Sequence, residues 1–215
     1  LSLALAEQAA QRRITGIDQS AEYVAYAASL NPFPDRVQFE TGDAQQLRYA
    51  EGSFQAALSL LVFNFIPDPA KALAELRRVI RPGGVIAAAV WDYGEGMQML
   101  RAFWDAAARI DDSGARADEK NMRLCRQGEL AELLHAGGLR HVEESALVVQ
   151  TSFSSFADYW EPFLLGQGPA GMFVKNLSPS RVAALRNELR SRLAPSDGGT
   201  SLHLTARAWA ARGIV

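Results

Sequence analysis

The chain has 215 residues and a formal net charge of −2, with 48% hydrophobic and 21% charged residues. This composition is typical of a folded globular protein, and the length allows one ordinary domain plus an insertion. The basic excess usual in nucleic-acid-binding proteins is missing, so we expect no nucleic-acid partner. No apolar stretch reaches the roughly 20 residues of a membrane-spanning helix, so we expect no membrane partner either. The single cysteine, Cys125, excludes an intrachain disulfide and favours a reducing, cytoplasmic location.

Two predicted strands near the N-terminus each end in an aspartate. Residues 1–11 have the apolar spacing of a helix, and the first strand follows from Ile14 to Asp18. The second strand starts at Val37, after two prolines, and ends at Asp43. Ligands of an open parallel sheet bind outside the carboxyl ends of its strands, so we expect both carboxylates to reach one crevice. There they can accept hydrogen bonds from a ribose diol or an adenine amine.

The middle of the chain continues the alternation of strand and helix. Ser20 is placed to cap the helix between the first two strands. The apolar run Phe54–Phe63 predicts a strand buried on both faces. Asp68 is expected to cap a further helix with Pro69 at its first position, and Val85–Val90 is another apolar strand. The helix that Ser20 is expected to cap presents Ala21, Val24, Ala25 and Ala28 on one face, at helical spacing.

The last part of the chain combines helices with a final strand. Glu129–Ala136 is predicted to be a helix, and the polar segment Asp111–Lys120 a loop. His141–Gln150 is predicted to be a strand, and the alternation after Ser201 predicts a further strand, either an edge strand or an antiparallel partner of the previous one. The intervening residues 151–200 are too many for a structureless loop, and their apolar spacing predicts two helices, with a turn at the glycines between Gly166 and Gly171. We interpret this insertion as a lid over the crevice.

Several motifs follow one another in a recognisable order. Asp18 ends one strand and Gly42-Asp43-Ala44 the next; Pro67-Asp68-Pro69 and Arg81-Pro82-Gly83-Gly84 come later. With this order the chain resembles the class I S-adenosylmethionine-dependent methyltransferases, closest to the small-molecule branch called type 11 or UbiE-like. The resemblance covers roughly the first two-thirds of the chain. It implies an α/β fold with a Rossmann-like doubly wound sheet, mostly parallel with an antiparallel last strand. Residues 1–150 and 201–215 would form this core, and residues 151–200 a helical lid insertion.

The resemblance also implies a cofactor and its binding residues. S-adenosylmethionine would supply a methyl group to a small-molecule acceptor by in-line displacement. Asp18 would accept both ribose hydroxyls, and Asp43 the adenine amine. The predicted cofactor-binding residues are Asp18, Gln19, Gly42, Asp43, Ala44, Leu61 and Val62, and the candidate substrate residues are Asn64, Trp91, Asp92, Tyr159 and Trp160. No catalytic base is indicated, and no metal is expected because the three histidines lack the spacing of a metal pair.

One segment of the resembled family has no counterpart in this chain. There, a strand ending in an acidic, glycine-rich loop precedes the first helix, and that loop holds the methionine part of the cofactor. It would be the central strand, and a parallel sheet without it would leave two rows of backbone groups unpaired. We therefore expect this strand and loop to lie upstream of Leu1 in the full-length protein.

Two other functions are compatible with the sequence. An acidic residue after the second strand also suits the ribose of NAD, which favours an NAD(P)-dependent oxidoreductase. Gly42-Asp43-Ala44 and the antiparallel last strand argue against that alternative. The third possibility is a non-catalytic scaffold that keeps the methyltransferase fold, and the missing glycine-rich loop is its best support. The acceptor atom and the oligomeric state are not indicated by the sequence.

Overall fold

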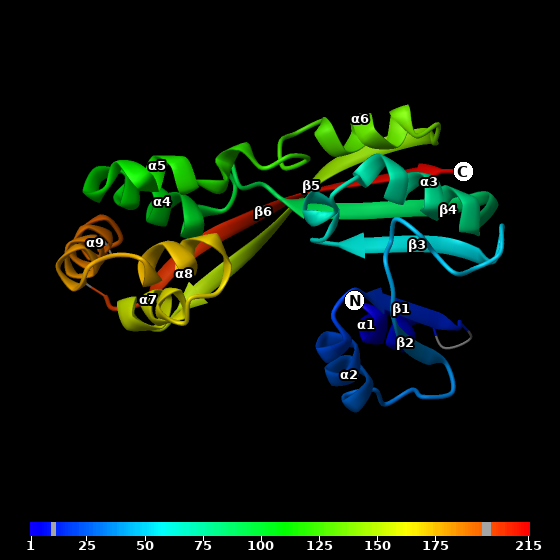
Figure 1. The fold of residues 1–215 in the computed structure, drawn as a ribbon, viewed down its shortest axis with the longest axis horizontal. Helices are drawn as coiled ribbons and strands as arrows, with labels where there is room; N and C mark the ends of the chain where they lie inside the picture. Colours follow the sequence, from blue (N-terminus) through cyan, green and yellow to red (C-terminus); the bar gives the residue numbers. More distant parts are fainter. Residues whose placement is uncertain (10–11, 195–198) are drawn as a thin grey trace. The chain divides into compact units, whose positions relative to one another are not determined.

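The computed structural model describes residues 1–9, 12–194 and 199–215, and they divide into two compact units (Figure 1). The first unit consists of Leu1–Ala88, Leu133–Glu143 and Arg212–Val215. The second unit consists of Ala89–Glu132 and Glu144–Ala211. The predicted end of the first helix, at Gln11, lies outside the described residues. Within them, no helix is long and apolar enough to cross a lipid bilayer.

The first unit begins with the predicted order of helix, strand, helix and strand. The two strands pair in parallel, with Asp18 beside Thr41 and Gly16 beside Phe39. A Cβ atom on Gly16 would lie only 2.7 Å from the Phe39 ring, so this strand position has no room for a side chain. The elements are α1 (Ser2–Gln8), β1 (Ile14–Asp18), α2 (Ala21–Ser29) and β2 (Val37–Thr41).

The predicted helix α2 and its cap are confirmed, but the helix has no buried residue. The Ser20 hydroxyl accepts a hydrogen bond from the Tyr23 backbone N–H at 3.2 Å. No residue of α2 is buried among the residues that the structure describes, and Tyr23 and Tyr26 are 70% and 66% exposed. The physical reason is the narrow sheet, because two strands present little apolar surface to a helix. The residues of the predicted apolar face, which are exposed or half-buried, are Ala21, Val24, Ala25 and Ala28.

A separate four-stranded sheet has the order β3-β4-β6-β5. The Gly83 N–H donates to the Val215 carbonyl and the Asp92 N–H to the Arg207 carbonyl, so β4 and β6 are antiparallel. The Thr151 hydroxyl donates to the Leu204 carbonyl, and Arg212 pairs with Glu143, so residue numbers fall along β6 as they rise along β5 and these strands are antiparallel too. The predicted antiparallel last strand is therefore confirmed, but it lies between β4 and β5 and is not an edge strand. The strands are β3 (Phe54–Leu60), β4 (Ile80–Trp91), β5 (Arg140–Phe153) and β6 (Leu202–Ile214).

The apolar sequence of β3 predicted burial on both faces, and this prediction is wrong. It is an edge strand of the four-stranded sheet, with β4 on one side only among the described residues. Leu58 and Leu60 are each 47% exposed. The strand ends at Leu60, and the short 3-10 helix η1 (Phe63–Phe65) follows it. An apolar run predicts a strand here, but its burial depends on neighbours that the run does not specify.

Two helices of the first unit pack closely at a glycine. The Asp68 carboxylate accepts the Lys71 N–H at 2.9 Å, which confirms the predicted cap of α3 (Pro69–Val79). Leu73 of α3 is buried, and a Cβ atom on Gly137 would lie 2.3 Å from it. This close approach places α3 against the end of α6 (Glu129–Ala136).

The second unit is built around a cluster of buried aromatic and aliphatic side chains on five of its elements. Phe103 stacks on Phe163 with the ring centroids 4.5 Å apart, and Trp104 packs edge-on against Phe173 at 5.5 Å. Its helices are α4 (Gln98–Ile110), α5 (Asp112–Ala117), η2 (Glu119–Asn121), α7 (Phe156–Leu164), α8 (Gly168–Lys175) and α9 (Pro179–Arg192).

Two predicted irregular segments of this unit are helical instead. The predicted loop Asp111–Lys120 contains α5 and η2, because Asp111 and Asp118 each cap a helical turn. The predicted turn Gly166–Gly171 contains the start of α8, with Pro169 in its first turn. Polar and glycine-rich composition indicated loops, but local capping was sufficient to start short helices.

Candidate functional site

The carboxyl end of β1 positions Asp18 through an Asx-type turn. Its Oδ1 accepts the Ser20 backbone N–H at 2.8 Å, while the Ser20 hydroxyl caps α2. The side chain of Asp18 is exposed, and Gln19 beside it is exposed as well. The Asp18 carbonyl accepts the Gly42 N–H at 2.9 Å, so the ends of β1 and β2 are held together by the backbone.

Asp43 follows the end of β2 and is connected to Gln19. The Gln19 amide donates to Asp43 Oδ1 at 3.3 Å, which confirms that the structure brings these predicted residues together. Gly42 approaches Ile17 so closely that a Cβ would lie 3.0 Å from its methyl group. Ala44 is half-buried immediately after Asp43. Asp18, Gln19, Gly42, Asp43 and Ala44 therefore form one local group, as predicted.

Gln45 was not predicted from the sequence, although it organises this group. Its backbone N–H donates to Asp43 Oδ1 at 2.8 Å, and its side-chain amide donates to both carboxylate oxygens at 3.1 and 3.2 Å. Its Oε1 accepts the Asp68 N–H at 3.0 Å, which connects the group to the start of α3. The position two residues after a turn aspartate was the available signal.

These contacts set the charge state of Asp43. The backbone and side-chain N–H groups of Gln45 hold the pKa of Asp43 below its ordinary value, because they stabilise the carboxylate form. Lys71 adds a smaller electrostatic contribution in the same direction. Asp43 is therefore an ionised acceptor with a fixed orientation at neutral pH.

The predicted residues after β3 lie at a strained turn. Leu61 has a φ of 62°, in the left-handed region that a leucine rarely adopts. Val62 is exposed, whereas Asn64 is buried in η1. Strained backbone at the end of a strand often accompanies a binding site, so this observation is consistent with a functional turn.

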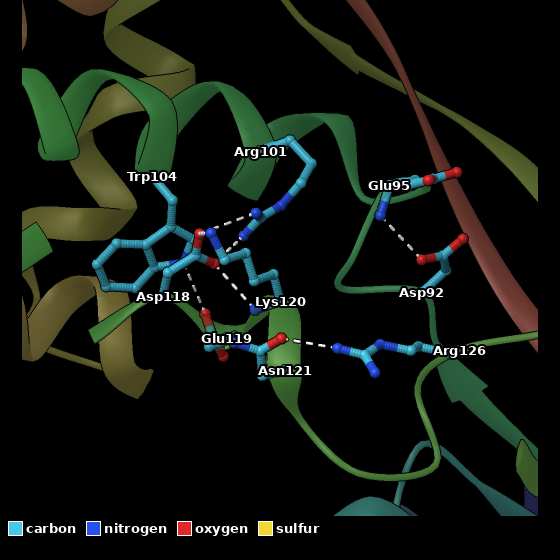
Figure 2. A network of polar contacts seen from close by, with 9 residues as sticks. All are labelled: Asp92, Glu95, Arg101, Trp104, Asp118, Glu119, Lys120, Asn121 and Arg126. Carbon is cyan, nitrogen blue, oxygen red and sulfur yellow. Dashed lines mark hydrogen bonds and ion pairs between the residues drawn. The ribbon is translucent and has the colours of Figure 1, made fainter. Parts of the chain in front are cut away.

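Asp92 lies in the second unit and is held by charged and backbone donors. Burial alone would raise its pKa, but the Glu95 N–H at 2.9 Å and the Arg207 guanidinium at 2.8 Å together hold the pKa below its ordinary value. Figure 2 shows the contact with Glu95. Trp91, just before it, is half-buried. Arg207 also stacks on Trp209, with its guanidinium carbon 4.8 Å from the ring centroid.

A second polar group of this unit surrounds the start of η2 (Figure 2). The Trp104 indole N–H donates to Glu119 Oε2 at 3.1 Å, and Arg101 pairs with the buried carboxylate of Asp118. Glu119 is 8% exposed, and burial raises its pKa more strongly than the Trp104 and Arg101 contacts lower it. Sequence reasoning missed Glu119, because a glutamate in a polar segment carries no signal of burial.

Tyr159 and Trp160 occupy the interior of the aromatic cluster. Tyr159 has no exposed surface and donates its hydroxyl to the Met99 carbonyl at 3.0 Å. Trp160 is 3% exposed. The structure thus shows a packing role for both side chains, and their contact with substrate stays a prediction.

With this geometry described, similarity to known proteins becomes informative. Residues 1–88 match the family model described as "Methyltransferase domain". This part of the chain, less than half of its length, is therefore similar to the methyltransferase domain. S-adenosylmethionine is the methyl donor of the family. The family match favours the methyltransferase prediction over the oxidoreductase alternative.

Two curated methyltransferases illustrate the extent of the similarity. The 2-methyl-6-phytyl-1,4-hydroquinone methyltransferase of Synechocystis sp. is 34% identical over 92 residues, covering 43% of this chain and 29% of that protein. The methyltransferase ucsB of Acremonium sp. is 29% identical over 204 residues, covering 91% of this chain and 64% of that protein. The chain thus spans less than two-thirds of the length of either relative.

A solved structure extends the methyltransferase similarity to the fold of nearly the whole chain. The putative methyltransferase from an antibiotic biosynthesis pathway of Anabaena variabilis superposes with a TM-score of 0.61 at 18% identity. The match covers 97% of this chain and 84% of that one. The chain therefore has the α/β methyltransferase fold, with a mixed arrangement of strands.

The acids of the methyltransferase domain fit the adenosyl half of the donor chemically. A ribose diol and an adenine amine both donate hydrogen bonds, and Asp18 and Asp43 are acceptors. Both lie at the carboxyl ends of adjacent parallel strands, and Gln19 links their positions. Gly42 directly precedes Asp43 and carries no side chain.

Proposed function

We propose that this protein transfers a methyl group from S-adenosylmethionine to a small-molecule acceptor. The observation that supports this most directly is the hydrogen-bonded group at the ends of β1 and β2, in which Gln19 and Gln45 position Asp43 beside the turn of Asp18. It lies within the residues that match the methyltransferase family. The relatives' names include a hydroquinone methyltransferase, which supports a small-molecule acceptor.

In this proposal the residues of the first unit bind and orient the donor. Asp18 accepts the ribose hydroxyls, Asp43 accepts the adenine amine, and the Ala44 N–H donates to a ring nitrogen. Leu61 and Val62 contact the adenosyl or methionine part. The donor supplies an activated methyl group, so the protein contributes mainly alignment and exclusion of water.

The finer predictions belong to the same proposal. We infer a doubly wound, mostly parallel core made of residues 1–150 and 201–215, with residues 151–200 as a helical lid that selects the acceptor. A cytoplasmic location also remains a prediction. The substrate candidates in this scheme are Asn64, Trp91, Asp92, Tyr159 and Trp160.

The test is cofactor binding by the purified full-length protein and by its Asp18→Ala variant, measured by isothermal titration calorimetry. Loss of charge-assisted hydrogen bonds should weaken S-adenosylmethionine binding by about 1–3 kcal/mol. Asp35→Ala is a matched control, because Asp35 is an exposed aspartate in the same part of the chain. Equal affinity of Asp18→Ala and the original protein would remove Asp18 from the site. Binding of NAD without binding of S-adenosylmethionine would refute the proposed function itself.

A further inference from the structure

The outer edge of β5 is the most open strand edge of the second unit. β5 is last in the order β3-β4-β6-β5, so β6 covers one side and no strand covers the other among the described residues. Figure 1 shows β5 running beside β6 along its length. The free side of such a strand presents unpaired N–H and C=O groups that can pair with another chain.

This edge lacks the features that normally protect it. Every residue from Ser145 to Gln150 is exposed, and none of them is charged, proline or glycine. Leu147, Val148 and Val149 are 49%, 57% and 48% exposed. Because successive side chains point to opposite faces, apolar surface is exposed on both faces of the strand. We call residues 145–150 the open edge.

We propose that the open edge pairs in antiparallel fashion with the open edge of a second copy of this chain. The two-fold axis of such a pair runs perpendicular to the sheet. Residues directly opposite each other must point to the same face of the sheet, so the axis passes beside a residue that lies opposite its own copy. With Val148 on the axis, Leu147 faces Val149 of the second copy, and Val149 faces Leu147. The three large apolar residues of the edge thus cover one another.

The sequence around the axis is self-complementary, which favours a second copy over an unrelated strand. Moving outward, Ala146 faces Gln150 of the second copy, and Ser145 faces Thr151. Glu144 faces Ser152, so no carboxylate lies opposite another. Like charges directly opposite one another would destabilise a strand pair, and this register avoids them. The apolar centre and polar ends repeat on both strands, as an isologous contact requires.

The pairing would join two four-stranded sheets into one continuous sheet. Its order would be β3-β4-β6-β5 followed by the same strands of the second copy in reverse. Because the contact involves one strand from each copy, we expect a dimer that dissociates on dilution. The inference does not depend on methyl transfer.

The experiment is sedimentation equilibrium of the purified protein and of charged variants at position 148. The original protein should show a reversible monomer–dimer equilibrium. Val148→Lys and Val148→Glu should each be monomeric, since like charges would meet on the axis. An equimolar mixture of the two should form a heterodimer, because a lysine then faces a glutamate. This recovery excludes misfolding as the cause of dissociation.

A control and a cross-link complete the test. Leu165→Lys changes a 73% exposed leucine at the end of α7 and should leave the dimer intact. Val148→Cys should cross-link on oxidation, since directly opposed residues of antiparallel strands lie within disulfide range, and the native Cys125 is buried. A purely monomeric original protein would overturn the proposal. So would a dimer that persists in Val148→Lys, or a charged pair that does not associate.

Discussion

The β1–α2–β2 segment and the aromatic cluster of the second unit differ sharply in packing. α2 has no buried residue in the described structure and exposes Tyr23 and Tyr26, whereas Phe103 and Tyr159 of the cluster have no exposed surface. The segment nevertheless carries Asp18, at the end of β1, in the candidate site. The predicted binding residue Asp18 therefore lies where few apolar contacts hold the chain, and the packing that supplies stability lies elsewhere.

The cluster gains its stability from the geometry of its rings as well as from burial. Phe103 contacts three other aromatic rings in stacked or edge-on arrangements. Each such pair contributes about 0.5–1.5 kcal/mol beyond the area that it buries. The β1–α2–β2 segment has no equivalent, because its tyrosines point to solvent. We therefore expect substitutions in the aromatic cluster to lower the free energy of unfolding more than substitutions in the β1–α2–β2 segment.

The largest effect is expected from Phe163→Ala. This change removes a 4% exposed ring that stacks on Phe103, so the free energy of unfolding of the second unit should fall by about 3–5 kcal/mol. Tyr23→Ala in α2 is the contrasting variant, with an expected change of at most about 0.5 kcal/mol. Urea denaturation followed by far-ultraviolet circular dichroism measures both, because all four tryptophans lie in the second unit and their fluorescence would not report on α2. Similar losses of unfolding free energy in the two variants would show that the difference in packing does not produce a difference in stability.

An intermediate effect is expected at Glu119. Glu119→Ala leaves the buried Trp104 indole N–H without its acceptor, so we expect a loss of about 1–3 kcal/mol in the free energy of unfolding. Glu119→Gln keeps an acceptor for the indole and removes the buried charge. The glutamine variant should therefore be at least as stable as the original protein at neutral pH.

The pKa shift of Glu119 predicts how the free energy of unfolding changes with pH. Burial raises the folded-state pKa of Glu119 above its unfolded-state value. The folded state then binds more protons, so the free energy of unfolding decreases as the pH rises from the unfolded pKa through the folded pKa. Glu119→Gln should remove this slope, which urea midpoints between acidic and neutral pH would reveal. If the slope of stability against pH is unchanged in Glu119→Gln, Glu119 has the same pKa in the folded and unfolded states.

The smallest effect on stability is expected from Gln45→Ala. The variant loses three side-chain hydrogen bonds around Asp43 and Asp68, so the pKa of Asp43 should rise toward its ordinary value. Titration of the Asp43 carboxyl by NMR measures this shift directly. Gln46→Ala, at an exposed neighbouring glutamine, should leave the pKa unchanged. An unaltered pKa in Gln45→Ala would leave the backbone N–H of residue 45 and the Gln19 amide as the groups that orient Asp43.

Local patterns were sufficient to predict much of the fold. Ser20 and Asp68 cap the helices that they were expected to cap, because a cap involves only neighbouring residues in the chain. The predicted alternating strand is β6, which begins at Leu202, and its antiparallel pairing with β5 is confirmed. Asp18 ends β1 and Asp43 follows the adjacent parallel strand β2, and Gln19 beside Asp18 contacts Asp43, so the structure places the two acids near each other, while their binding of a cofactor stays a prediction.

Burial was the property that the sequence alone did not determine. The apolar strand β3 and the helix α2 remain largely exposed, while Glu119 in a polar segment is buried. Element type depends on spacing and capping within about a dozen residues, and these can be read along the chain. Burial depends on which distant surfaces meet, so only the tertiary structure decided it. The Gln45–Asp43 contacts are local, but the hydrogen bond from the Asp68 N–H to the Gln45 side chain forms only because the end of β2 and the start of α3 lie together.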